Sequence, residues 1–316
     1  PIAEAENNSG LMIQFSNWIA REVKKHYPDV KLQIFAYTAC LEPPKTIKPD
    51  DNIIVRVCNT GSDQITGAPS NPDFVKTVNN WKKLSNGLYV WDYGIIYQDA
   101  SGLPYPSEFG YPAVFKYYAD NGFKGQFWEL EAPDRSDMWE LKFYMLSKYI
   151  VDPYRKDFDF LLDDFCNKFY GNAGKYIAAV RRTLYEASKV PRTVIGWVPN
   201  NGDFEFIDYK TMDKCQKLFA EARKAAGNDK ELQFRINKAS MGLDRLLSYE
   251  SHRRFIAEFA KTTGKPQNDF PYDIPAIRKR FLNSWEASLK YFGFITEANT
   301  CTCIIPPTVL SLHSLN

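Results

Sequence analysis

Strand-like and helix-like segments alternate along the first 130 residues. Segments 31–37, 52–58, 88–92 and 123–127 are rich in β-branched and aromatic residues, which suit buried strands. Helical patterns precede or separate them, at residues 11–26, with Ser9 as the expected cap, and at residues 73–84 and 109–121. Strands that are separated by crossover helices pair in parallel and place their loops on one side of the sheet. We therefore expect four parallel strands that neighbour one another in chain order.

The pattern becomes helical after Pro133. Residues 137–140 (Asp-Met-Trp-Glu) have the spacing of a capping box, which predicts a helix start there. Further helices are expected at 159–170, 173–188, 208–226, 231–262 and 281–292. The fold class is thus α/β followed by α, with domains at 1–133 and 134–297 and an irregular tail at 298–316.

Composition limits the classes of function. The chain has 316 residues, of which 44% are hydrophobic, enough for one large barrel or two domains. Forty basic and 38 acidic residues give a net charge of +2 without a basic run, so we expect no nucleic-acid partner. No stretch reaches eighteen apolar residues, so we predict no membrane span. Three histidines and six scattered cysteines indicate neither a metal centre nor a disulfide scaffold, and we predict no cofactor.

Acids and aromatic rings gather at the ends of the last two predicted strands. They are Trp91, Asp92, Tyr93, Trp128, Glu129 and Glu131. In a β/α barrel the carboxyl ends of the strands face the active site, and a carboxylate between aromatic rings suits a sugar, which offers hydroxyls and flat C–H faces. For any single acid the ordinary interpretation is a solvated strand end. Only their clustering argues for a site.

Two of these acids are candidate catalytic residues. Glycoside hydrolysis needs one protonated and one ionised carboxyl group. Asp92 and Glu129 end successive strands, and neighbouring strands lie about 4.8 Å apart, so their carboxyls could be separated by the roughly 5 to 9 Å that retaining and inverting enzymes use. Because side chains alternate along a strand, Trp91 and Asp92 cannot both face inward unless the strand has already turned into a loop.

The other candidates would bind the sugar. Trp91, Tyr93 and Trp128 would stack on the ring. Glu131 and Glu42 are secondary candidates for lining the same pocket, although loop acids are usually just solvated. Arg56 could bind a sugar carboxylate, or it could pair with an acid inside the sheet.

Several short motifs, in this order and spacing, resemble a known family. They are Asn17-Trp-Ile-Ala20, Tyr27-Pro-Asp29, Phe35-Ala-Tyr37, Pro43-Pro44, Trp91-Asp92-Tyr93, and Leu141-Lys142 through Asp152-Pro153 to Phe169-Tyr170-Gly171. From about residue 10 to about 190 the chain resembles a bacterial family of domains of unknown function, whose barrels are related to α-glucuronidases and β-hexosaminidases. The resemblance implies a glycoside-hydrolase-type (β/α)₈ (TIM) barrel followed by a helical region. It also implies that Tyr37, Trp91, Asp92, Tyr93 and Glu129 are pocket residues.

The chain departs from that family in its strand count. The four predicted strands resemble the second half of the barrel, so the half that normally carries a further catalytic carboxylate is missing. Either the sequence is part of a longer protein, or the other half is supplied elsewhere, for example by a second copy. The resemblance alone implies a secreted or periplasmic location.

Three functions follow as hypotheses. The first is a carbohydrate-active protein, a glycoside-hydrolase-like barrel that acts on a glycan through carboxylates at strand ends. The second is a non-catalytic glycan-binding or structural module that keeps the aromatic wall and lacks the acid pair. The third is a helical interaction protein with an exposed apolar face after residue 134. The sequence does not identify the sugar, the linkage or the stereochemistry.

Overall fold

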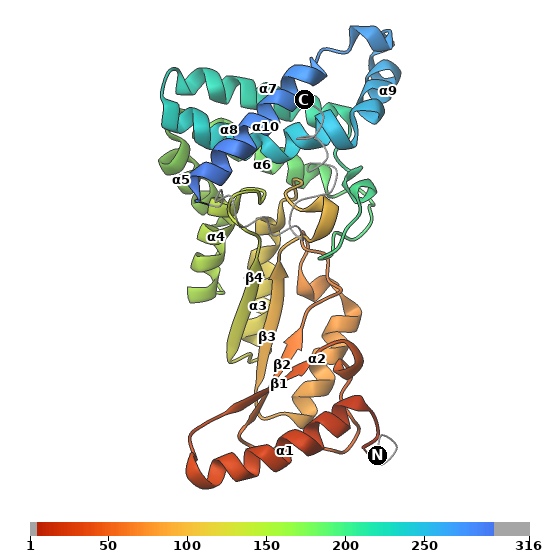
Figure 1. Ribbon diagram of the computed structural model, residues 1–316, viewed down its shortest axis with the longest axis vertical. Coiled ribbons are helices and arrows are strands. Elements are labelled where there is room, and N and C mark those ends of the chain that lie inside the picture. Colours follow the sequence, from red (N-terminus) through yellow and green to blue (C-terminus); the bar gives the residue numbers. More distant parts are fainter. Residues whose placement is uncertain (1–4, 294–316) are drawn as a thin grey trace. The chain divides into compact units, whose positions relative to one another are not determined.

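The computed structural model describes residues 5–293 and contains one four-stranded sheet (Figure 1). Its strands are β1 (Leu32–Ala36), β2 (Ile53–Cys58), β3 (Leu88–Gly94) and β4 (Gly125–Leu130). They pair in parallel in the order β1-β2-β3-β4, which confirms the predicted order and direction. The fourth strand starts two residues later than expected, because the N–H of Phe123 still bonds to the carbonyl of Tyr118 at the preceding helix end.

The chain forms two compact units, each built from two pieces of sequence. The first comprises residues up to Gly94 together with Ala113–Leu130, and it holds the sheet. The second comprises Ile95–Pro112 together with the residues from Glu131 onwards. The predicted boundary near residue 133 places residues 95–112 with the strands. In the structure these residues cluster with the helical part of the chain.

Three helices form the core of the first unit with the sheet. They are α1 (Asn8–His26), α2 (Pro72–Leu84) and α3 (Tyr111–Asp120). Helix α2 starts where predicted, because the Asn71 side chain accepts hydrogen bonds from the first free N–H groups. Helix α1 starts earlier than predicted and is capped by Asn7. Ser9, the expected cap, lies inside the helix and donates its hydroxyl to the carbonyls of Cys40 and Glu42 at 2.8 and 2.6 Å.

The two faces of the sheet differ in their surroundings. Side chains alternate along each strand, so one set points toward the helices. This helix-covered face contains Ile34, Ala36, Val55, Val57, Leu88 and Val90, all buried in one core cluster with residues of α1, α2 and α3. On the opposite face, Phe35 and Phe127 remain 42% and 40% exposed. We call this second face the aromatic face, after Phe35, Tyr89, Trp91, Tyr93 and Phe127.

The second unit is helical apart from its loops. Its α-helices are α4 (Trp139–Val151), α5 (Phe158–Tyr170), α6 (Gly174–Ala187), α7 (Tyr209–Ala226), α8 (Lys230–Arg245), α9 (His252–Thr263) and α10 (Ile274–Tyr291). The helix expected over 231–262 is divided by the π-helical turn Leu246–Glu250. Helix α10 begins earlier than expected, because Asp273 caps it by accepting from the N–H of Ala276.

A buried ion network connects residues 95–112 to helices α4 and α6. Arg181 donates to both carboxylate oxygens of Glu108 at 2.7 and 2.9 Å, to Asp137 at 3.0 Å and to the carbonyl of Tyr105 at 3.0 Å. Lys142 also lies 3.1 Å from Asp137. Asp137 was expected to cap α4, and that prediction is wrong: the cap position is Met138, in the left-handed region at φ 53°, and the carboxylate serves Arg181.

The predicted tail at 298–316 lies outside the described residues. Within residues 5–293, no helix combines the length and the apolar character that crossing a membrane requires.

Candidate functional site

The centre of the aromatic face is the guanidinium of Arg56. Its carbon lies 5.7 to 6.0 Å from the ring centroids of Phe35, Tyr89, Trp91 and Phe127, within the range of cation–π attraction. Register explains this arrangement, because Phe35, Arg56 and Tyr89 are direct partners across β1, β2 and β3. The buried Nε of Arg56 has no hydrogen-bond partner among residues 5–293. A cation held by rings in this way keeps hydrogen-bonding capacity for a ligand.

Sequence reasoning missed three of these four rings. Only Trp91 is a candidate from the sequence, which predicts strands and no binding role for Phe35, Tyr89 and Phe127. The missed signal is the spacing of two along each strand, since Tyr89 and Trp91 must share a face, as must Phe127 and Glu129. Arg56 contacts aromatic rings within the sheet. Pairing with an acid inside the sheet is the other prediction for this residue, and no such acid is among its described contacts.

Glu129 lies on the aromatic face at the carboxyl ends of the strands. It is the register partner of Tyr93, and its Oε2 accepts a hydrogen bond from Trp91 Nε1 at 3.0 Å. Tyr93 is almost buried, and burial raises the pKa of its hydroxyl, as do the neighbouring Cys58, Tyr37 and Glu129. Trp91, Tyr93, Tyr37 and Glu129, all predicted from the sequence, are therefore brought together at one end of one face.

Asp92 lies on the opposite face, so the predicted acid pair is not formed. The register pairs Asp92 with Trp128 and Tyr93 with Glu129, and neighbouring positions along a strand point to opposite sides of the sheet. Asp92 is 5% exposed and accepts hydrogen bonds from Asn59 at 2.9 Å, from the N–H of Tyr93 at 2.8 Å and from the hydroxyl of Tyr118 in α3. Two carboxyls separated by a sheet cannot act on one glycosidic bond.

Burial determines the chemistry of Asp92. It raises the pKa of this carboxyl to about 6, although the hydrogen bonds from Tyr118, Tyr93 and Asn59 act in the other direction. Each of these donors would lose a buried acceptor if the carboxyl were removed. Asp92 therefore joins the ends of β2 and β3 to helix α3, which is a structural role.

Three other candidates also lie away from the aromatic face. Trp128 points to the helix-covered side, where its ring stacks on Phe115 of α3 with centroids 5.1 Å apart and an interplanar angle of 18°. Glu131 belongs to the second unit, where it is 5% exposed and accepts from the N–H of Ile96 at 2.9 Å. Glu42 accepts from the hydroxyl of Thr77 in α2 at 3.0 Å. These side chains are accounted for by packing and hydrogen bonding.

The structural role of Asp92 makes a testable prediction. Asp92→Ala should lower the free energy of unfolding by about 2 kcal/mol, because three buried donors lose their acceptor while one buried charge is removed. The measurement is urea unfolding followed by tryptophan fluorescence at pH 7. Asp73→Ala, at an exposed position of helix α2, is the control and should change stability by less than about 0.5 kcal/mol. Equal stability of Asp92→Ala and the parent protein would contradict this assignment.

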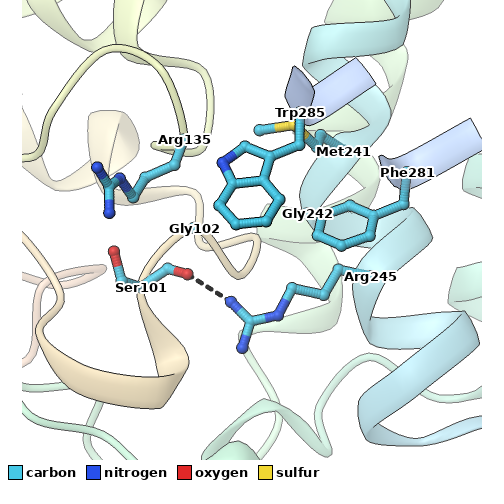
Figure 2. A pocket seen from close by; sticks show the side chains of 8 residues that line it. All are labelled: Ser101, Gly102, Arg135, Met241, Gly242, Arg245, Phe281 and Trp285. Atoms are coloured by element: carbon cyan, nitrogen blue, oxygen red, sulfur yellow. Dashed lines mark hydrogen bonds between the residues drawn. The ribbon is translucent and has the colours of Figure 1, made fainter. Parts of the chain in front are cut away.

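A small cavity in the second unit is too small for a sugar. It is lined by Ser101, Gly102, Arg135, Met241, Gly242, Arg245, Phe281 and Trp285, and its volume is about 20 Å³ (Figure 2). That volume is enough for about one water molecule. Arg245 donates to the carbonyl of Ser101 at 2.6 Å, and a Cβ at Gly242 would lie 2.5 Å from the carbonyl oxygen of Gly102. The cavity thus marks a close contact between helix α8 and the loop of residues 95–112.

Comparisons with known proteins identify a family and no function. Among residues 5–293, no group of three His, Cys, Asp or Glu side chains is placed to hold a metal ion. No curated protein matches the sequence. The sequence model of a family described as a domain of unknown function (DUF4838) matches residues 2–181, which is more than half of the chain and includes the whole sheet and the Arg181 network. The chain therefore belongs to the DUF4838 family of domains of unknown function.

Proposed function

We propose that this protein is carbohydrate-active and that it binds a glycan on the aromatic face of its sheet. The observation that carries the proposal is the set of rings around Arg56, with Glu129 and two tyrosines at the carboxyl ends of the same strands. Sugar rings stack their C–H faces on such aromatic surfaces and use their hydroxyls to bond with charged groups. Arg56 would bond to a hydroxyl or carboxylate of the sugar through its terminal guanidinium N–H groups.

The resemblance to glycoside-hydrolase barrels supports the same proposal. Four parallel strands in chain order, with helices on one face, fit half of a (β/α)₈ barrel whose interior would be the aromatic face. We infer that a further half-barrel, from the same protein or from a second copy, would complete the glycan site. In this proposal residues 1–133 belong to the barrel, residues 134–297 form a helical domain, and the protein is secreted or periplasmic.

Glycan binding without hydrolysis is the role that the geometry favours. Among the residues of the four strands, Glu129 is the acid on the aromatic face, because Asp92 points to the other side. Hydrolysis would need a second carboxyl about 5 to 9 Å from Glu129, supplied by another part of the protein. Glycoside hydrolysis is nevertheless the second candidate function, because the bond from Trp91 holds the Glu129 carboxylate in a fixed orientation.

A glycan array followed by calorimetry tests the binding role. The 316-residue chain should bind at least one class of glycan, and Trp91→Ala should weaken that binding about five- to thirtyfold, since one stacked ring contributes about 1 to 2 kcal/mol. Trp18→Ala is the matched control, because Trp18 is a 64% exposed ring on helix α1 and should leave the affinity unchanged. If no glycan binds, or if both variants bind alike, the aromatic face is not a glycan site.

A panel of chromogenic glycosides separates the two candidate functions. Turnover that Glu129→Gln reduces by about 10² to 10⁴-fold would establish hydrolysis, because an acid or base of the reaction contributes about that much. Glycan binding without turnover of any substrate would establish the non-catalytic role. Asp92→Asn should leave turnover unchanged, since its carboxyl lies on the helix-covered face.

A further inference from the structure

A polar groove runs between helices α8 and α10 of the second unit, which lie next to each other (Figure 1). The turn between α7 and α8, at Gly227 and Asn228, also lines the groove. The volume of the groove is about 640 Å³. Small-ligand sites usually have volumes of about 300 to 1,000 Å³. The groove therefore has room for a monosaccharide or a disaccharide, unlike the 20 Å³ cavity at Gly242.

The charges on the groove are all positive. Lys230 at the start of α8, and Lys279 and Arg280 in α10, line it, and no carboxylate does. Lys230 and Lys279 are exposed and form no ion pair or hydrogen bond with any residue between 5 and 293. Their ammonium groups are thus available for a ligand.

Arg280 is held rigidly and adds to the positive charge. It donates to both oxygens of Asp244 at 2.6 and 2.7 Å and to the side chain of Gln216 at 3.0 Å. Arg223 lies 3.9 Å from the same carboxylate, so two guanidinium groups share one buried acid. Burial lowers the pKa of Arg223 to about 10, and the nearby Arg280 acts in the same direction.

The acids of the surrounding helix ends are already engaged. Asp229 and Asp273 cap α8 and α10 by accepting from backbone N–H groups. Glu231 pairs with Arg235 at 3.0 Å, and Glu286 pairs with Lys290 at 2.5 Å. None of these four carboxylates lines the groove, so the two free lysines are not neutralised from within it.

Amides and one ring complete the lining. The side chains of Asn228 and Asn283 form no hydrogen bond with a described residue, and both are exposed in the groove. Gln233 donates to the carbonyls of Arg223 and Gly227 at 2.8 Å, which fixes its amide and leaves the oxygen as an acceptor. Phe234 packs near Tyr291, with centroids 5.0 Å apart and an interplanar angle of 37°, and it also lines the groove. Amides suit hydroxyl groups, and rings suit sugar C–H faces.

We propose that the α8/α10 groove is a second binding site, which takes a small anionic sugar, a mono- or disaccharide that carries a carboxylate or a sulfate ester. Lys230 and Lys279 bind the oxyanion, and Asn228, Asn283 and Gln233 bind the hydroxyls. This site is independent of the aromatic face, because it shares no residue with that face and belongs to the other unit of the chain.

Calorimetric titration of the 316-residue chain tests the site with defined probes. These are D-glucuronate, a heparin-derived sulfated disaccharide, cellobiose as the neutral sugar and sodium sulfate as the oxyanion alone. At least one of the two acidic sugars should bind, and which of them binds distinguishes a carboxylate from a sulfate ester. Its affinity should fall with added salt, because exposed charges are screened.

Variants assign the binding to the groove. Lys230→Gln combined with Lys279→Gln should weaken the affinity at least tenfold. Lys261→Gln, at an exposed lysine of α9, should leave it unchanged. The proposal fails if neither acidic sugar binds below about 10 mM or if the double variant binds like the parent. It also fails if the double variant weakens the binding of cellobiose or sodium sulfate as much as it weakens that of the acidic sugar, since the groove would then not recognise an anionic sugar.

Discussion

Replacing Arg181 with alanine is expected to lower the free energy of unfolding by about 3 to 5 kcal/mol. The residue is 1% exposed, and its guanidinium holds the carboxylates of Glu108 and Asp137, which are 0% and 6% exposed. Loss of the cation leaves two buried acids without their strongest partner. Breaking a buried pair from one side is more damaging than removing both partners, because the remaining charge stays buried and uncompensated.

The neighbouring Arg182 provides a matched control. It also pairs with two acids, Asp163 at 2.8 Å and Asp159 at 3.1 Å, but its side chain is 36% exposed. Arg182→Ala should therefore change stability by at most about 1 kcal/mol. Urea unfolding followed by far-ultraviolet circular dichroism would measure both variants. Adding Glu108→Gln to Arg181→Ala should recover part of the loss. Similar losses for the two alanine variants would contradict the importance of the buried network.

The second large effect is a loss of stability with rising pH that depends on Glu131. Burial raises the pKa of this carboxyl from 4.5 to about 7, and the nearby Lys142 and the N–H of Ile96 only partly offset the rise. Its Oε2 is buried without a hydrogen-bond partner among the described residues. Between pH 4.5 and pH 7 the folded protein thus holds a proton that the unfolded chain has lost. The stability that this proton provides is complete below pH 4.5 and is lost as the pH rises through 7, by about 3 kcal/mol.

Glu131→Gln isolates this effect, because glutamine does not titrate. Unfolding free energies at pH 5 and pH 8 should show a steeper decline in the parent protein than in the variant, by about 2 to 3 kcal/mol. The comparison is needed because Asp92, with a pKa raised to about 6, contributes a decline of the same sign in both proteins. Parallel pH profiles for parent and variant would show that Glu131 is already ionised in the folded state at pH 5.

The order and direction of the strands could be predicted from local sequence. Each strand is a short run of β-branched and aromatic residues, and the long connections between them permit only crossover pairing. Which face a strand-end acid occupies depends on where the strand stops. β3 continues to Gly94, past the predicted end at residue 92, so Asp92 remains within the alternation and points away from Trp91. The local sequence does not show that end, because it depends on pairing with β4.

Long-range partners also explain the helix ends that were mispredicted. The spacing of Asp137 and Glu140 is that of a capping box, but Arg181, 44 residues later, binds the aspartate instead. Likewise, Ser9 suits a cap in isolation, while carbonyls more than thirty residues away accept its hydroxyl. In both cases a local propensity of about 1 kcal/mol is outweighed by a tertiary contact that the sequence pattern does not reveal.

The division of each unit into two pieces of chain affects how the protein can form during synthesis. Residues 95–112 leave the ribosome before α3 and β4, yet Glu108 binds Arg181, which is 73 residues further along the chain. Until α6 has been made, Glu108 has no arginine to neutralise it. The loop of residues 95–112 must therefore stay hydrated while strands β1 to β4 assemble. Truncation before residue 181 would leave that acid permanently unpaired. A gene fragment that ends between β4 and α6 is therefore expected to yield a sheet with an unfolded loop.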